Sequence, residues 1–284
     1  MKRLLIIILL TIPIIVKAES QIEQDIQNNG FYINSQGVKI NSENYNKIKN
    51  FIRDEEIEKI SPRYYQLIAE GGEIIGKDSA YFETYTITDA IGNNITNTRE
   101  ISEQEYNNVD INENSRNTSH STSYKEITII QTSATGSLAR FVVQVSWKKL
   151  PTNRSFDVIA YRTSSSSIIY DFESYQEYVL NGTASEIYYD DTSNNFKSTN
   201  YGAGVSQNLV NNATSYYHTL AATVNCGATK VYATFQHAQG DLTLAQSQSY
   251  TFSSSGYGGV LNFTDTTARN TYDQMGGVSL NLIC

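Results

Sequence analysis

Residues 139–147, with the sequence ARFVVQVSW, alternate between apolar and other side chains. Every second residue is apolar: Ala139, Phe141, Val143, Val145 and Trp147. In an extended chain successive side chains point to opposite faces, so this period of two places the apolar set on one side. The stretch therefore predicts a strand that lies in the core of a β-sheet.

Short alternating runs continue towards the C-terminus after a turn at Pro151 and Asn153. The return strand starts at residues 156–160, and further runs occupy residues 185–189, 218–224, 231–237, 248–252, 258–263 and 278–282. Short strands separated by Gly, Asn and Ser are typical of antiparallel sandwiches and barrel-like sheets. We predict a mainly β protein in which residues 124–284 form an antiparallel β domain of one of these two kinds.

Residues 76–123 are predicted to form a β-hairpin followed by a polar linker. Residues 81–88 and 95–101 flank Gly92-Asn93-Asn94, a sequence that tolerates the positive φ of hairpin turns. Residues 107–123 contain almost no apolar side chains, so we place the main domain boundary there.

Residues 19–75 predict a small helical region. Ser42 is the expected N-cap of a helix over residues 43–59, and a second helix ends at Gly71-Gly72.

The N-terminus has the pattern of a secretory signal peptide. Lys2 and Arg3 precede an apolar run over residues 4–16, which is shorter than the roughly 20 residues that span a bilayer as a helix. We predict a signal peptide over residues 1–18, cleaved after Ala18, and therefore a secreted, extracellular protein. The alternative is an N-terminal membrane anchor.

The charge of the chain restricts its partners. Removal of Lys2, Arg3 and Lys17 takes the formal net charge from −8 to −11. Binding of phosphate groups requires a positive face, so nucleic acid is not an expected partner. Anionic membranes are not expected either, whereas cationic or neutral partners remain open.

The chain contains two cysteines, Cys226 and Cys284. Disulfides persist outside the cell, and a bridge between these residues would hold the last strand to an earlier one. The alternative is a pair of unbridged thiols.

The segment Trp147-Lys148-Lys149-Leu150-Pro151 and its continuation over residues 154–160 resemble part of certain uncharacterised secreted proteins of low-GC Gram-positive bacteria. The Gly-rich residues 256–260 and 272–278 are similar to theirs as well. The resemblance implies export but no known activity.

No catalytic motif, cofactor site or metal site is expected. His218 and His237 lie in predicted strands without the closely spaced ligand pairs that structural zinc prefers. Glu55-Glu56 lies on the predicted helix beside Arg53, which favours a solvated charged face. The Gly-rich segments lack the lysine of a phosphate-binding loop, so their glycines are expected to permit bulges, tight turns and close strand approach. The functional alternative is a flexible rim beside Tyr257 or Tyr272.

Two functions are proposed from the sequence, and an enzyme whose site is assembled from distant residues stays a third alternative. The first is a non-enzymatic extracellular binding or interaction module that presents Tyr, Asn and Ser to a glycan, a cell-wall polymer or a protein. The second is a secreted pore-forming or toxin-like β protein, in which residues 213–224 and 250–263 would supply membrane-inserting strands.

Overall fold

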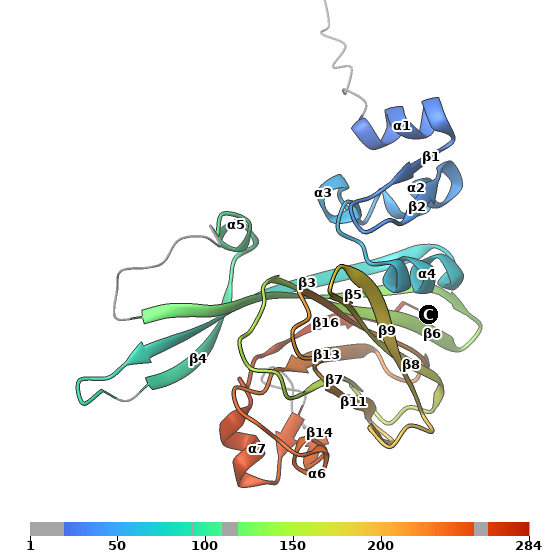
Figure 1. Cartoon of the computed structure of the whole chain (residues 1–284). Helices are drawn as coiled ribbons and strands as arrows, with labels where there is room; N and C mark the ends of the chain where they lie inside the picture. The colour runs from blue at the N-terminus through green and yellow to red at the C-terminus, as the bar shows by residue number, and fades with distance from the viewer. Residues whose placement is uncertain (1–19, 93, 110–118, 253–260, 284) are drawn as a thin grey trace, which may run out of the picture.

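The strand that the alternating pattern predicts is confirmed as β6 (Leu138–Lys149). The computed structural model describes residues 20–92, 94–109, 119–252 and 261–283. Phe141, Val143 and Val145 are completely buried on one face of β6. The mainly β fold with a small N-terminal helical region is likewise confirmed, and Figure 1 shows its arrangement.

The larger sheet has seven antiparallel strands in the order β4-β3-β5-β6-β12-β8-β9. Besides β6 these are β3 (Ile74–Thr88), β4 (Asn94–Ile101), β5 (Ser119–Thr135), β8 (Ile169–Leu180), β9 (Thr183–Asp190) and β12 (Ser215–Asn225). Strands β3 and β4 form the predicted hairpin, but β3 also pairs with β5 over most of its length. Residues 76–88 are therefore part of the same sheet as the strands from β5 onward.

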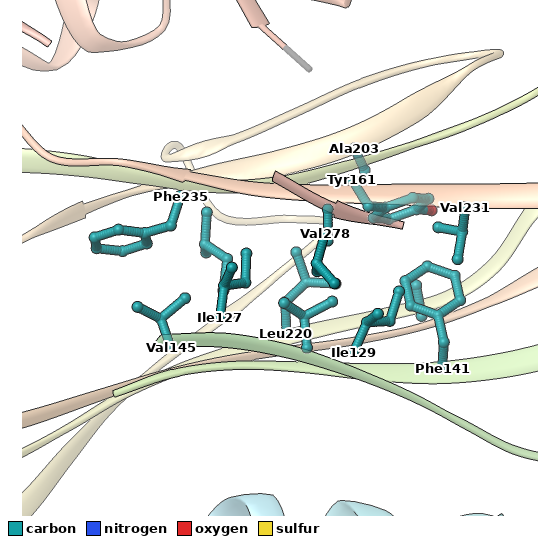
Figure 2. Packing of buried hydrophobic residues seen from close by; sticks show 14 of the residues in the cluster. Ile127, Ile129, Phe141, Val145, Tyr161, Ala203, Leu220, Val231, Phe235 and Val278 are labelled. Atoms are coloured by element: carbon teal, nitrogen blue, oxygen red, sulfur yellow. The ribbon is translucent and has the colours of Figure 1, made fainter. Parts of the chain in front are cut away.

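The smaller sheet has five strands in the order β10-β11-β7-β13-β16. They are β7 (Phe156–Thr163), β10 (Phe196–Thr199), β11 (Gly202–Asn208), β13 (Lys230–Gln236) and β16 (Gly277–Asn281). Figure 2 shows Tyr161 and Phe235 of this sheet facing Val145 and Phe141 of the larger one. The two sheets thus enclose the main hydrophobic core, and the fold is a β-sandwich.

The helical region covers the outer face of the seven-stranded sheet. It comprises α1 (Gln21–Asn29), β1 (Phe31–Ile33), β2 (Lys39–Asn41), α2 (Ser42–Ile48), α3 (Asp54–Ile57) and α4 (Pro62–Gly71). Leu67 and Ile68 of α4 pack in one cluster with Ile130 and Val142 of the sheet. This second core fixes the helices against the sandwich (Figure 1).

The predicted helix over residues 43–59 is wrong in detail. The chain forms α2 and α3 instead, and the N-cap of α2 is Asn41 rather than Ser42. Ile52, which lies between the two helices, packs into the second core together with Tyr45 and Ile48. The predicted end of α4 is confirmed, since Gly72 adopts a φ of 92°.

The outer face of the five-stranded sheet is covered by the C-terminal part of the chain. This cover consists of α6 (Leu244–Ser247), β14 (Tyr250–Phe252), β15 (Leu261–Phe263) and α7 (Thr266–Thr271). Tyr250 and Phe263 pack there against Val158 and Ala160 of β7. In the described part of the chain, no helix has the length and apolar character needed to cross a membrane.

Candidate binding site

A row of side chains runs across four strands on the outer face of the seven-stranded sheet. Tyr81 of β3 is paired with Glu126 of β5, Glu126 with Ser146 of β6, and Ser146 with Tyr217 of β12. Ile127 points into the sandwich core, so its neighbour Glu126 points to the opposite face, under the helical region. Paired residues on one face of a sheet have Cβ atoms about 5 Å apart.

A cavity of about 710 Å³ lies over this row. Its remaining walls come from α3, from Tyr64 of α4, and from α5 (Glu103–Asn107), the short helix after β4. Five aromatic residues line it: Tyr64, Tyr81, Tyr106, Trp147 and Tyr217. The volume lies in the range of pockets that hold small organic ligands, and the lining combines aromatic with charged side chains.

Glu126 is the unusual residue of this cavity. Its carboxylate accepts a hydrogen bond from the Thr128 hydroxyl at 3.1 Å, but no lysine or arginine among the described residues forms an ion pair with it. Burial, followed by the negative charge of Glu56, raises the pKa of Glu126. A carboxylate that is both desolvated and without a counter-ion destabilises the fold.

The tyrosines supply rings and protonated hydroxyls. The hydroxyl of Tyr64 has no hydrogen-bond partner within the described chain, although Tyr64 is only 3% exposed. Burial raises the pKa of Tyr64, Tyr81 and Tyr106, and raises that of Tyr217 to about 12. These hydroxyls therefore remain neutral at physiological pH.

Two of the cations that line the cavity, Lys77 and Lys148, have other partners, whereas Lys59, which also lines it, is exposed. Lys77 Nζ lies 2.6 and 2.7 Å from the two carboxylate oxygens of Glu56, which also accepts the Arg53 backbone N–H at 2.8 Å. Lys148 Nζ donates to the carbonyl oxygens of Tyr106 and Asn107 at 2.5 and 2.8 Å. Burial and the nearby charge of Lys59 lower the pKa of Lys148.

The interpretation of Glu55-Glu56 as a solvated charged face was half right. Glu55 is exposed, but the Glu56 side chain is only 17% exposed and is held by Lys77 inside the cavity wall. The burial of Glu56 was not predicted, because its partner Lys77 lies on β3 and the helix pattern describes only residues that are near one another in the sequence. Sequence reasoning also missed Glu126, whose signal is a charged residue directly before the apolar run Ile127–Ile130.

Two aromatic residues were predicted to lie on a binding surface, and of these the structure describes Tyr272. Tyr272 is 4% exposed, its ring stacks on Phe263 at 4.2 Å between centroids, and its hydroxyl donates to the Phe156 carbonyl oxygen. The prediction is wrong for Tyr272, because the C-terminal cover buries it. Tyr257 lies outside the described residues.

Of the two predicted disulfide partners, only Cys226 belongs to the described residues. Cys226 follows β12 and its backbone N–H donates to the Ser137 carbonyl oxygen at 2.7 Å. Cys284 lies outside the described residues, as does the predicted signal peptide. The bridge therefore stays a prediction.

The two strand histidines lie in the sandwich interior. His218 Nδ1 is 2.6 Å from Gln207 Oε1, and His237 Nδ1 is 2.9 Å from Asp157 Oδ1. Burial, then the charges of His237 and Lys125, lower the pKa of His218 to about 3. No group of three His, Cys, Asp or Glu side chains that could hold a metal ion occurs in the described ranges.

Comparisons with protein-family models, with curated proteins and with solved structures gave no match.

Proposed function

We propose that this chain is a secreted, non-enzymatic binding protein that holds a group of an extracellular ligand in the cavity under its helical region. The observation that supports this proposal most is Glu126, a desolvated carboxylate without a counter-ion at the cavity floor. Such a residue lowers stability, and groups of this kind occur preferentially at functional sites. The ligand is a glycan, a cell-wall polymer or a protein.

Export follows from the predicted signal peptide, and the chemistry of the ligand follows from the lining. Rings such as Tyr106 offer rigid faces, while protonated hydroxyls donate hydrogen bonds. A cavity of about 710 Å³ accommodates one side group of a polymer or one side chain of a protein, not a whole macromolecule.

The proposal is tested by filling the cavity. Ser146→Trp places an indole on the floor between Glu126 and Tyr217 and should abolish saturable binding of the labelled protein to cells, isolated walls or a glycan array. Tyr201→Ala is the control, since Tyr201 is 52% exposed and does not line the cavity. Thermal unfolding checks that both variants fold. Equal binding by folded Ser146→Trp and the unchanged protein would contradict the proposal.

A second candidate function is the pore-forming or toxin-like protein. The strand expected to insert, β12, lies between β6 and β8, and Leu220, Ala221 and Ala222 are completely buried, so its release would dismantle both cores. The β3–β4 hairpin favours this candidate instead. Its end carries three exposed isoleucines, Ile87, Ile91 and Ile95, and in Figure 1 it extends beyond the smaller sheet.

Dye release from liposomes tests the second candidate. Leakage that is lost in an Ile91→Ser variant would support it, because Ile91 is 84% exposed and its replacement leaves both cores intact. The absence of dye release from both neutral and anionic liposomes, at neutral and acidic pH, would contradict the pore-forming candidate.

A further inference from the structure

We propose that the group held in the cavity is an organic ammonium ion, which forms an ion pair with Glu126 and contacts the faces of the surrounding tyrosine rings. This inference rests on the proposed function and names the chemical class of its ligand.

The first argument is charge compensation. A carboxylate removed from water is stable in a protein when a cation or several N–H donors neutralise it, and the half-buried Glu126 accepts only from the Thr128 hydroxyl among the described residues. The cation that completes the site therefore comes from outside the described chain. A neutral sugar would leave the charge uncompensated, and an anion would be repelled by it.

The second argument concerns the cations that the cavity already contains. Lys77 is the nearest competitor, because its charge acts on Glu126. Its ammonium group, however, is held by both oxygens of Glu56. Turning Lys77 towards Glu126 would take this partner from Glu56, which would keep only its contacts with Arg53, whose guanidinium lies 3.3 Å from one carboxylate oxygen. The Lys148 ammonium is likewise held by two backbone carbonyls.

The third argument is the aromatic lining. The face of an aromatic ring attracts a cation, and the attraction increases when water is excluded. Tyr81 is paired directly with Glu126 across the sheet, and Tyr64 enters from α4. Tyr106 enters from α5, and the Lys148 ammonium lies 5.3 Å from the centroid of its ring. In such a site the Glu126 carboxylate neutralises a methylated or primary ammonium ion, and the tyrosine rings that line the cavity enclose it.

The fourth argument is the hydroxyl of Tyr64. It is buried, it lines the cavity, and it has no hydrogen-bond partner among the described residues. A buried hydroxyl without a partner is destabilising, so this group, like Glu126, is completed by a ligand. An ammonium ligand that carries a hydroxyl or ester oxygen would satisfy both groups at once.

The experiment compares a cation with its neutral isostere. Choline and 3,3-dimethylbutan-1-ol have the same shape and differ in charge, and each is titrated calorimetrically into the purified protein. We expect choline to bind at least about tenfold more tightly, since a desolvated cation–π contact and an ion pair together exceed 1.4 kcal/mol. Glucose serves as the neutral sugar.

Glu126→Gln keeps the shape of the side chain and removes its charge, so it should abolish the preference for choline over the isostere. Glu100→Gln is the matched control, because Glu100 is an exposed carboxylate that does not line the cavity, and this variant should retain the preference. Tyr64→Phe, which keeps the ring, should weaken choline but not tetramethylammonium, which has no hydroxyl.

The outcomes separate the inference from the function on which it rests. Equal affinity for choline and the isostere, no measurable choline binding, or an unchanged preference in Glu126→Gln overturns the ammonium inference. In those cases loss of cell or glycan binding in Ser146→Trp still supports a ligand in the cavity. Full binding by folded Ser146→Trp overturns the proposed function itself.

Discussion

Ser61 at the start of α4 donates a hydrogen bond from its hydroxyl to the Glu177 carboxylate of β8, at 2.5 Å and across 116 positions of the chain. The same hydroxyl accepts from the Tyr64 backbone N–H and from Gln144 Nε2, and Glu177 also accepts the Arg63 backbone N–H at 3.0 Å. Glu177 and Ser61 thus cap the helix together. Tyr64 belongs to α4 and lines the cavity, so this contact holds the helix that carries Tyr64 against the sheet.

Replacing Ser61 with alanine should destabilise the protein by about 3 kcal/mol, because the helix loses its cap, and the buried Glu177 and the half-buried Gln144 lose a partner. Thr243→Ala is the control, since Thr243 caps α6 in the same way but is exposed, and a cost of about 1 kcal/mol is expected. Urea unfolding measures both. Equal losses would show that the contact to Glu177 contributes nothing beyond an ordinary cap.

Replacing Glu126 with glutamine should stabilise the protein at pH 7. The pKa of Glu126 is raised in the fold, so the charged form is disfavoured there relative to the unfolded chain. Below its unfolded pKa of about 4.5 both states are protonated and the residue brings no penalty, whereas the penalty grows as the pH rises through the folded pKa. The advantage of glutamine should therefore be present at pH 7 and absent at pH 4.

The free energies of unfolding at these two pH values check this expectation. Glu55→Gln should change neither of them measurably, because Glu55 is exposed. A destabilised Glu126→Gln at pH 7 would mean that the carboxylate has a compensating partner in the fold, and the charge argument for an external cation would then fail.

The sandwich could be predicted from the sequence because its strands alternate. In β6 each apolar residue of the pattern lies in the core, and the turn residues after it separate β6 from β7 correctly. Strand β11 (Gly202–Asn208) escaped prediction because its first three residues, Gly202, Ala203 and Gly204, are all small and give no clear alternation. Gly204 is required there, since a Cβ would lie 2.6 Å from that of Ala160.

The cavity could not be predicted, for a physical reason. Its floor consists of residues that register brings together from four strands, and Tyr81 and Tyr217 become the two ends of that row only after the sheet has formed. The position of α4, which contributes Tyr64 to the cavity, depends on the hydrogen bond between Ser61 and Glu177, and no local sequence pattern predicts that contact. Secondary structure follows from short-range periodicity, whereas this site follows from strand order and docking.

Acidification should destabilise the protein through His218. Its pKa is about 3 in the fold, because the imidazole is completely buried, and about 6.5 in the unfolded chain. Below pH 6.5 the unfolded chain binds a proton at this histidine and the folded chain does not. The contribution of neutral His218 to the free energy of unfolding is therefore complete above pH 6.5 and is lost as the pH falls towards 3. We expect a loss of about 2 kcal/mol between pH 7 and pH 5 from this residue.

His218→Gln removes this titration and keeps a polar group near Gln207. Its stability at pH 7 will be lower, but its decline between pH 7 and pH 5 should be shallower than that of the unchanged protein by the same amount. Parallel declines in urea unfolding at pH 7, 6 and 5 would assign the acid sensitivity to other groups.

The last strand should depend on a bridge between Cys226 and Cys284. The described chain ends close to Cys226, since Leu282 N–H donates to the Thr229 carbonyl oxygen at 2.9 Å. Closing a loop of roughly 58 residues is worth about 4 kcal/mol in the loop-entropy model. Reduction, or the paired Cys226→Ser and Cys284→Ser variants, should therefore lower the free energy of unfolding by about this amount.

Peptide mapping of the purified protein under non-reducing conditions gives the direct measurement. It should recover the two cysteine peptides as one linked species, and reduction should release them. Gln131→Ala is the control for the strand's other anchor, because the Gln131 side chain exchanges two hydrogen bonds with the backbone of Ile283. If reduction leaves the stability unchanged while Gln131→Ala lowers it, hydrogen bonds rather than a covalent bridge hold the C-terminal strand in place.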